Sequence, residues 1–266
     1  MDFSKTLFRA SSAGHLMSEP QSKAAKDRGE LSKDAKRHLI DVYVSNKYGR
    51  KTEVQNKYIT KGLAVEEDSI TLYSRVKKKF FKKNAEHLAN EFIKGTPDLY
   101  EGKSIREATT IIDVKSSWDI FTFFRVKSEA VNSLYYWQGQ SYMALTGAKI
   151  FQLGYCLVDT PEALIQDEER RLLWKMNAGT TENPDYIAAC EELRRQMTYP
   201  DIPFSERLIE FTVERNDADI ERLYAKVKQA RRFLRDFEEE HGASYTAAPP
   251  AAPIIDISKI ALTKIK

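Results

Sequence analysis

Residues 95–117, GTPDLYEGKSIREATTIIDVKSS, place charged side chains inside two segments that are otherwise typical of β-strands. The second segment contains TTIIDV, and β-branched residues favour strands. Asp113 and Lys115 are two residues apart, so on a strand both side chains point to one face. A hairpin would bring Asp98, on the preceding segment, beside Asp113. Because buried charges are costly unless they are paired or bind a metal, this stretch constrains the fold around it.

Two carboxylates that converge in this way repel each other and raise the pKa of one, unless a cation lies between them. Mg²⁺ suits such a place, because it is held by one or two carboxylates together with water and phosphate oxygens. Lys115 would then be an ammonium near a metal-bound water, which the metal makes easier to ionise. The alternative is a structural Asp–Lys pair with Asp98 in a turn, which is the commoner case for an isolated D-x-K pattern.

The helix expected at about 61–80 places a carboxylate on an apolar face. Four apolar residues recur at helical spacing along one side: Leu63, Ile70, Tyr73 and Phe80. At a step of about 100° per residue, Glu66 lies at the centre of this stripe, and a second, weaker apolar side indicates a helix sandwiched between two layers. A carboxylate that faces the core needs a partner, which is either a metal on the sheet or an interior Lys or Arg.

The helix expected at 128–146, ending at Gly147, places an amide on an apolar face. Its face comprises Val131, Tyr135, Tyr142 and Leu145, with Gln138 among them. A buried amide must be hydrogen-bonded. Gln138 therefore either supports the site or is an ordinary core glutamine.

The order of the predicted elements indicates a mixed α/β fold with helices flanking a central sheet. Further helices are expected at about 31–48, 161–176, 184–197 and 217–240, and further strands at 149–159 and 207–215; residues 1–20 look irregular. We expect one domain over residues 1–241, with the core motifs at 61–159. GASYTAAPPAAP predicts a flexible linker at 242–253, and residues 254–266 are a candidate docking tail.

Composition excludes several classes of protein. No apolar run reaches the about 18 residues of a membrane span, and the N-terminus lacks the order of a signal peptide, so we expect a cytoplasmic protein without a membrane partner. Cys156 and Cys190 are too few for a disulfide framework or a four-cysteine cluster. The net charge of +3 demands no anionic partner. The basic stretch 75–83, RVKKKFFKK, either steers a polyanion to one face or is a solvated helix end.

A series of polar residues resembles the motifs of the PD-(D/E)xK nuclease superfamily. In chain order they are Glu66; Asp98 in GTPD; Asp113 and Lys115 in IIDVK; and Gln138 and Tyr142 in YYWQGQSYMALTG. The series is similar above all to the phage lambda exonuclease and YqaJ group, whose glycine-plus-four glutamate helix is matched by KGLAVEEDSITLY. It resembles the RecB nuclease domain more distantly. The resemblance covers residues 61–159, and Asp113 stands where lambda exonuclease has glutamate, which the superfamily motif permits.

The resemblance implies a restriction-endonuclease-like core and one or two Mg²⁺ ions, for which Mn²⁺ substitutes, without an iron–sulfur cluster. The implied catalytic residues are Glu66, Asp98, Asp113, Lys115 and Gln138. The implied metal ligands are Glu66, Asp98, Asp113 and the main-chain carbonyl of Val114. The implied DNA contacts are Thr96 and Tyr142 near the site, Arg75 and Lys78 in the basic stretch, and Arg9, Ser11 and Ser12, in FRASSAGHLM, for a 5′-phosphate.

The function that the resemblance implies is a Mg²⁺-dependent DNA exonuclease. Such an enzyme resects linear duplex ends from 5′ to 3′ for a single-strand annealing partner in phage-type recombination, in the bacterial host cytoplasm if the chain is phage-encoded. Relatives close into rings around DNA, so a homo-oligomer is a further expectation. Two alternatives stay open: a RecB-like single-strand or structure-specific nuclease, and a catalytically silent DNA-binding protein on the same fold. No P-loop sequence is found, so the chain carries no helicase motor.

A group of aromatic residues follows the predicted catalytic strand. Its members are Trp118, Phe121, Phe123 and Phe124. These side chains either stack on or wedge apart the ends of a duplex, or they are ordinary core, which is the usual use of aromatic residues.

Overall fold

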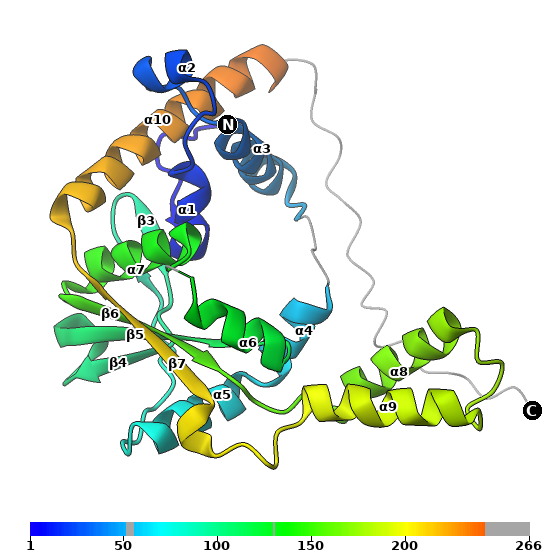
Figure 1. Cartoon of the computed structure of the whole chain (residues 1–266). Helices are drawn as coiled ribbons and strands as arrows, with labels where there is room; N and C mark the ends of the chain where they lie inside the picture. The colour runs from blue at the N-terminus through cyan, green and yellow to red at the C-terminus, as the bar shows by residue number, and fades with distance from the viewer. Residues whose placement is uncertain (52–55, 130, 243–266) are drawn as a thin grey trace, which may run out of the picture.

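The computed structural model describes residues 1–51, 56–129 and 131–242 as a mixed α/β fold (Figure 1). Its helices and strands, in chain order, are β1 (Phe8–Arg9), η1 (Ala10–Ser12), α1 (Ala13–Leu16), α2 (Lys23–Asp27), α3 (Lys33–Tyr48), α4 (Lys57–Ala64), α5 (Glu66–Val76), β2 (Leu88–Ala89), β3 (Ile93–Gly95), β4 (Leu99–Gly102), η2 (Ile105–Glu107), β5 (Ala108–Ser116), α6 (Ile120–Lys127), α7 (Ser133–Thr146), β6 (Ile150–Cys156), α8 (Glu162–Met176), α9 (Pro184–Met197), η3 (Phe204–Glu206), β7 (Leu208–Glu214) and α10 (Asp217–His241). The predicted linker, beyond Gly242, and the predicted tail lie outside the described residues.

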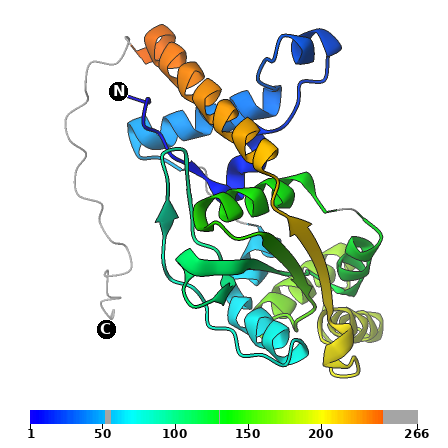
Figure 2. The ribbon, with the colours of Figure 1, turned by 90° about the vertical axis from the view of Figure 1, so that its left-hand side faces the viewer.

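The central sheet has four strands in the order β4-β5-β6-β7. β5 and β6 run parallel in the middle, and both edge strands are antiparallel to their neighbours. α7 covers one face of this sheet and α5 lies against the other (Figures 1 and 2). The middle strands are consequently buried on both sides, as the run of apolar residues in β5 requires. The predicted fold class, a mixed sheet flanked by helices, is confirmed.

α7 lies very close to the sheet. A Cβ atom on Gly139 would be only 2.3 Å from the Cδ1 atom of Phe151 on β6, so the helix can reach this position only with glycine. Gly147, with a φ angle of 82°, ends the helix as predicted, whereas the helix begins at Ser133 rather than at residue 128. The glycine contact fixes how near the polar residues of α7 come to β5.

The single helix predicted at 61–80 is wrong: the chain forms α4 and α5 instead. They are separated at Val65, whose φ and ψ angles of −113° and 19° are not helical. Leu63 and Phe80, predicted to face the core, are 73% and 87% exposed. The break changes the direction of the chain, so one helical projection cannot describe both halves. Glu66 is the first residue of α5 and does not lie at the centre of an apolar stripe.

The N-terminal 20 residues, predicted to be irregular, form β1, η1 and α1. β1 pairs in parallel with β3 in a small second sheet of order β1-β3-β2. Phe8, Ala13 and Leu16 are buried and belong to a cluster that includes residues of α3, α7 and α10. These elements have two to four residues each, so tertiary packing rather than local pattern must stabilise them.

Two further features complete the fold. α6 was not predicted; it begins after Asp119, which forms a capping box with Thr122. α8 and α9, predicted correctly, form an antiparallel pair that projects from the body, and we call it the α8–α9 arm (Figure 1). Arg194 joins its two helices through ion pairs with Glu162 and Glu169. No helix in the described part of the chain is both long and apolar enough to cross a membrane.

Candidate active site

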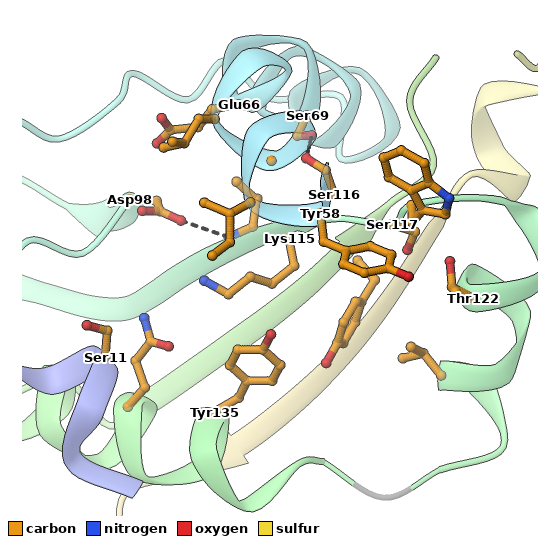
Figure 3. A pocket seen from close by; sticks show the side chains of 18 residues that line it. Ser11, Tyr58, Glu66, Ser69, Asp98, Lys115, Ser116, Ser117, Thr122 and Tyr135 are labelled. Atoms are coloured by element: carbon orange, nitrogen blue, oxygen red, sulfur yellow. Dashed lines mark hydrogen bonds between the residues drawn. The ribbon is translucent and has the colours of Figure 1, made fainter. Parts of the chain in front are cut away.

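The register of the sheet places Asp98 beside Asp113. Leu99, the first residue of β4, pairs with Ile112 on β5, so Asp98 lies opposite the next residue of the antiparallel ladder. Asp98 itself lies in the bend between β3 and β4, not within a strand as predicted. Its Oδ2 atom accepts a hydrogen bond of 3.0 Å from the backbone N–H of Val114, drawn as a dashed line in Figure 3. The backbone of β5 thus holds the first carboxylate.

Asp113 has partners on both carboxylate oxygens and is only 1% exposed. Its Oδ2 atom lies 2.5 Å from the Nζ atom of Lys115, two residues along the same strand. The Nε2 atom of Gln138, on α7, donates to Oδ1 over 3.1 Å. The same nitrogen donates to the hydroxyl of Tyr142 at 3.1 Å, one turn further along α7. The structure therefore joins β5 to α7 through one buried carboxylate.

The two carboxylates of this cluster share one ammonium, and burial shifts the pKa of one of them. Burial, together with the charge of Asp113, raises the pKa of Asp98 to about 8, although Lys115 and the Val114 N–H act in the opposite direction. Burial disfavours the ammonium form of Lys115, but the two carboxylates outweigh this and raise its pKa above the ordinary value. Lys115 therefore keeps its proton, and near neutral pH Asp98 also favours its protonated form. A cation that replaced the proton of Asp98 would be held by both carboxylates.

Glu66 lines the same cavity as Asp98, and its charge also contributes to the raised pKa of Asp98. It forms an ion pair of 2.8 Å with Lys83, which also lies 3.5 Å from Glu67. Among residues 1–51, 56–129 and 131–242, no three His, Cys, Asp or Glu side chains are grouped closely enough to hold a metal ion. The structure thus brings together Asp98, Asp113, Lys115 and Gln138, and leaves Glu66 at the rim of the cavity.

The donor set nevertheless fits a hard divalent cation. Asp98 and Asp113 supply oxygen atoms only, which are the ligands that Mg²⁺ prefers. Burial, and then the charge of Asp113, raises the pKa of Asp98, so a cation that binds here would replace a proton. Val114, whose carbonyl was expected to be a ligand, lines the cavity together with Asp98 and Lys115.

The three predicted contacts to a 5′-phosphate lie together in β1 and η1, but only one lines the cavity. Ser11 faces it near Asp98 and Glu66, with the ammonium of Lys115 pointing toward the same end (Figure 3). The Ser12 hydroxyl donates to the backbone carbonyl of Arg9 over 3.1 Å. Arg9 is exposed.

Thr96 and Tyr142 lie beside the carboxylate pair. The Tyr142 hydroxyl is 3.4 Å from the backbone carbonyl of Thr96 and is therefore placed to donate to it. Burial raises the pKa of Tyr142, so this hydroxyl keeps its proton. The Thr96 hydroxyl lies 2.9 Å from Nδ1 of His87, a residue that no sequence pattern singled out.

The basic stretch at residues 75–83 is largely paired within the protein. Lys77 lies 3.0 Å from Glu210 and Lys79 lies 2.6 Å from Glu101. The Arg75 guanidinium stacks over the ring of Phe204 at 4.3 Å. Lys78 is exposed and has a φ angle of 51°. The stretch therefore presents fewer unpaired cations than its sequence indicates.

The cavity has a volume of about 610 Å³ and includes residues that sequence analysis missed. They are Tyr58, Ser69, Ser116, Ser117, Tyr135 and Tyr155. Tyr135 lies one turn before Gln138 on α7, and the Lys115 ammonium lies 5.4 Å from its ring, so its helical spacing was the available signal. Tyr58 had no such signal, because its position depends on the break between α4 and α5.

Comparison with models of protein families gives no match, and comparison with curated protein sequences gives none either. Solved structures do match. A phage-related exonuclease from Haemophilus somnus 129PT shares 27% sequence identity, covers 89% of this chain and 96% of its own, and superposes with a TM-score of 0.69.

A second match is the alkaline exonuclease LHK-Exo from Laribacter hongkongensis, with 13% identity, coverage of 91% and 94% of the two chains, and a TM-score of 0.59. Its complex with dAMP matches with a TM-score of 0.57. At this level of identity LHK-Exo shows a shared fold. Together with the Haemophilus protein it shows that the chain has the lambda-exonuclease-like PD-(D/E)xK fold of phage-related and alkaline exonucleases.

Proposed function

We propose that this chain is a Mg²⁺-dependent deoxyribonuclease that degrades linear duplex DNA from its ends. The observation that carries the proposal is the group of Asp98, Asp113 and Lys115, in which two carboxylates share one ammonium beside a cavity that Asp98 and Lys115 line. A protein that only bound DNA would have no use for converging carboxylates, because they repel phosphate.

Asp98, Asp113 and the Val114 carbonyl would hold Mg²⁺, with Glu66 joining them from the rim. When bound, Mg²⁺ supplies Lewis acidity toward the phosphate and toward water. Glu66 must leave Lys83 to take part, and an ion pair in which Lys83 is exposed costs little to break.

The chain's own groups orient the reactants. Lys115 holds its proton at Nζ, so it donates a hydrogen bond to a water or phosphate oxygen rather than acting as a base. Gln138 holds the Asp113 carboxylate in place through Oδ1, which leaves the Asp113 orientation independent of the substrate. Ser11, at the acidic end of the cavity, and Thr96, beside the carboxylate pair, would contact phosphate oxygens.

We further infer 5′-to-3′ resection that leaves a single strand for an annealing partner, by a single domain spanning residues 1–241. Support comes from the likeness to the Haemophilus phage-related exonuclease and from the placement of Ser11 in the cavity. The LHK-Exo complex with dAMP supports a deoxynucleotide as ligand. A ring-shaped homo-oligomer belongs to the same proposal and would be detected by native mass spectrometry.

The test uses linear duplexes labelled at either the 5′ or the 3′ end, with Mg²⁺ or EDTA, and compares the wild type with Lys115→Ala. We expect Mg²⁺-dependent release of mononucleotides from the 5′ label first, and no release by the variant. Cleavage of a closed circle would indicate an endonuclease. Binding without cleavage by the wild type would instead support the catalytically silent alternative, and equal cleavage by both proteins would contradict the assigned site.

A further inference from the structure

The cavity of the candidate active site has a second end with a different chemical character. Glu66, Asp98 and Ser11 lie at one end, whereas Tyr58 and Thr122 lie at the other (Figure 3). Trp118, which follows β5, also lines the cavity. Its volume of about 610 Å³ is within the roughly 300–1,000 Å³ typical of sites that enclose small ligands.

Tyr58 and Trp118 form an aromatic pair in the wall of this second end. Their ring centroids are 5.3 Å apart and their planes meet at 76°, an edge-to-face contact. Tyr58 is 56% exposed, so burial does not explain its position. An aromatic pair that is exposed toward a cavity is available to a ligand.

The backbone of this wall is fixed from within. Lys61, on α4, is almost fully buried, and its Nζ atom donates to the backbone carbonyl of Trp118 over 2.8 Å. A buried ammonium needs such a partner, so the bond ties α4 to the segment after β5. The hydrogen bond from Lys61 to the Trp118 carbonyl therefore fixes the positions of Tyr58 and Trp118 relative to each other.

The wall is also braced by the α8–α9 arm. The Lys57 ammonium lies 4.7 Å from the Trp118 ring centroid and 5.7 Å from that of Tyr58. It pairs with Glu168 of α8 at 2.6 Å. Lys57 thus joins the arm to the aromatic pair by an ion pair and by cation–π contacts.

The other aromatic residues near Trp118 do not share this placement. Phe123 is fully buried in a core cluster with Leu157 and Tyr199. Phe121 and Phe124 are exposed but do not line the cavity. Of the four aromatic residues that follow β5, only Trp118 combines access to the cavity with a fixed position, and its partner Tyr58 comes from a different element.

We propose that Tyr58 and Trp118 form a stacking wall for the base of the terminal nucleotide, whose phosphate lies at the acidic end. This inference rests on the proposed nuclease function and adds a subsite to it. Every base has a π-face, so stacking holds a nucleotide without selecting its sequence, as degradation of arbitrary DNA requires. The polar groups of Ser117 and Thr122, which also line the cavity, would face the sugar.

The test compares two ligands that differ only in the base, dAMP and 2-deoxyribose 5-phosphate, by calorimetry on the full-length protein with Mg²⁺. We expect the wild type to bind dAMP about tenfold more tightly, as stacking contributions in other proteins indicate. Trp118→Ala should lose this preference and keep its affinity for deoxyribose 5-phosphate. Trp118→Phe should retain most of the preference, because a smaller ring still stacks.

Tyr58→Ala provides a second, exposed position and should reduce the preference for dAMP without affecting folding. Trp174→Ala is the matched control: this tryptophan is 85% exposed on the α8–α9 arm and does not line the cavity, so both affinities should be unchanged. If Trp118→Ala and Tyr58→Ala each lost affinity for both ligands equally, the two residues would have a merely structural role, and the proposal would be overturned. Wild-type protein without any preference for dAMP would do the same.

Failure of the subsite and failure of the nuclease function are separable. Digestion of linear duplex by the wild type is measured in parallel. If the wild type digests DNA but binds both ligands equally, the stacking wall is wrong and the nuclease stands. If it prefers dAMP, and loses that preference in the variants, but does not digest DNA, the nucleotide subsite stands and the hydrolytic function is wrong.

Discussion

Asp98 and Glu238 are both partly enclosed carboxylates near an ammonium, yet their pKa values are shifted in opposite directions. Glu238, on α10, accepts hydrogen bonds from Lys47 at 2.7 Å and from the Tyr43 hydroxyl at 2.5 Å, both on α3. Hydrogen bonds, first from Lys47, lower its pKa to about 2. Burial and a neighbouring carboxylate raise that of Asp98 to about 8.

The difference indicates that Glu238 stabilises the fold, whereas Asp98 is available to a ligand. The fold itself neutralises Glu238 and gains an α3–α10 contact from it. At Asp98 the fold instead brings a second carboxylate close and supplies one backbone N–H and the Lys115 ammonium for the two of them, and the pKa of Asp98 stays raised. Two carboxylates that share one ammonium beside a cavity are a place where a bound cation can replace a proton.

The largest expected effect is on DNA hydrolysis, which should depend on the Asp98–Asp113 cluster and not on Glu238. Asp113→Asn removes a proposed metal ligand and the partner of Lys115 without changing the shape of the side chain. We expect DNA hydrolysis to fall by about 10³-fold, the scale of losing a preorganised charged group. Glu238→Gln should hydrolyse DNA at the wild-type rate, and a comparable loss in both variants would show that activity reports stability alone.

Two buried glutamines on α7 give the next test. Gln138→Leu removes the donor to Asp113, and we expect Mn²⁺ affinity, measured by electron paramagnetic resonance, to fall about 10- to 100-fold. Gln140 is the matched control. It donates to the Glu214 carbonyl at 2.8 Å and accepts from the Asn216 N–H at 2.9 Å.

Gln140→Leu should therefore lower the free energy of unfolding and leave Mn²⁺ affinity unchanged. Equal affinities in both variants would remove Gln138 from the metal-binding site.

The pH dependence of stability tests the other carboxylate cluster. The folded-state pKa of Glu238 lies below its ordinary value near 4.5, so the folded protein prefers the ionised form. Its contribution to stability is complete above about pH 4.5 and is lost as the pH falls toward 2. In urea titrations of the metal-free protein, the free energy of unfolding should decline less steeply over this window in Glu238→Gln than in the wild type. An unchanged slope would mean that Lys47 and Tyr43 do not favour the carboxylate in solution.

The smallest expected effect is on Mn²⁺ affinity and comes from the ion pair between Lys83 and Glu66. Lys83 competes with any cation for Glu66, so Lys83→Gln should raise Mn²⁺ affinity by about two- to fivefold, the scale of one exposed ion pair. Lys79→Gln removes a neighbouring lysine that pairs with Glu101, and it should have no effect. A weaker affinity in Lys83→Gln would show that Lys83 does not restrain Glu66.

Local sequence predicted the parts of the fold whose signals are local. β5 followed from its β-branched run and the end of α7 from Gly147. β1 and α1 could not be predicted, since their stability comes from packing against distant helices. The break at Val65 carries neither Pro nor Gly, so nothing in the sequence marks it.

The candidate site was predictable where chain order alone decides proximity. A hairpin between the segments of Asp98 and Asp113 was sufficient to bring these residues together. The partner of Gln138 was not predictable, because it depends on how closely α7 approaches β5. Pairing of Glu66 with a basic residue was one of the two alternatives left open, and the structure shows Lys83 as that partner. The position of Tyr58 was missed, because it depends on the break between α4 and α5.

Gly139 has a consequence for protein engineering. Replacing an interior helical glycine by alanine is a routine way to stabilise a protein, with a gain of up to about 1 kcal/mol. Here the added methyl group would meet the Phe151 ring and push α7 away from the sheet, together with the adjacent Gln138. Thermostabilisation campaigns on this scaffold should leave that position unmodified, since rigidity gained in the helix would come with a displaced amide over Asp113.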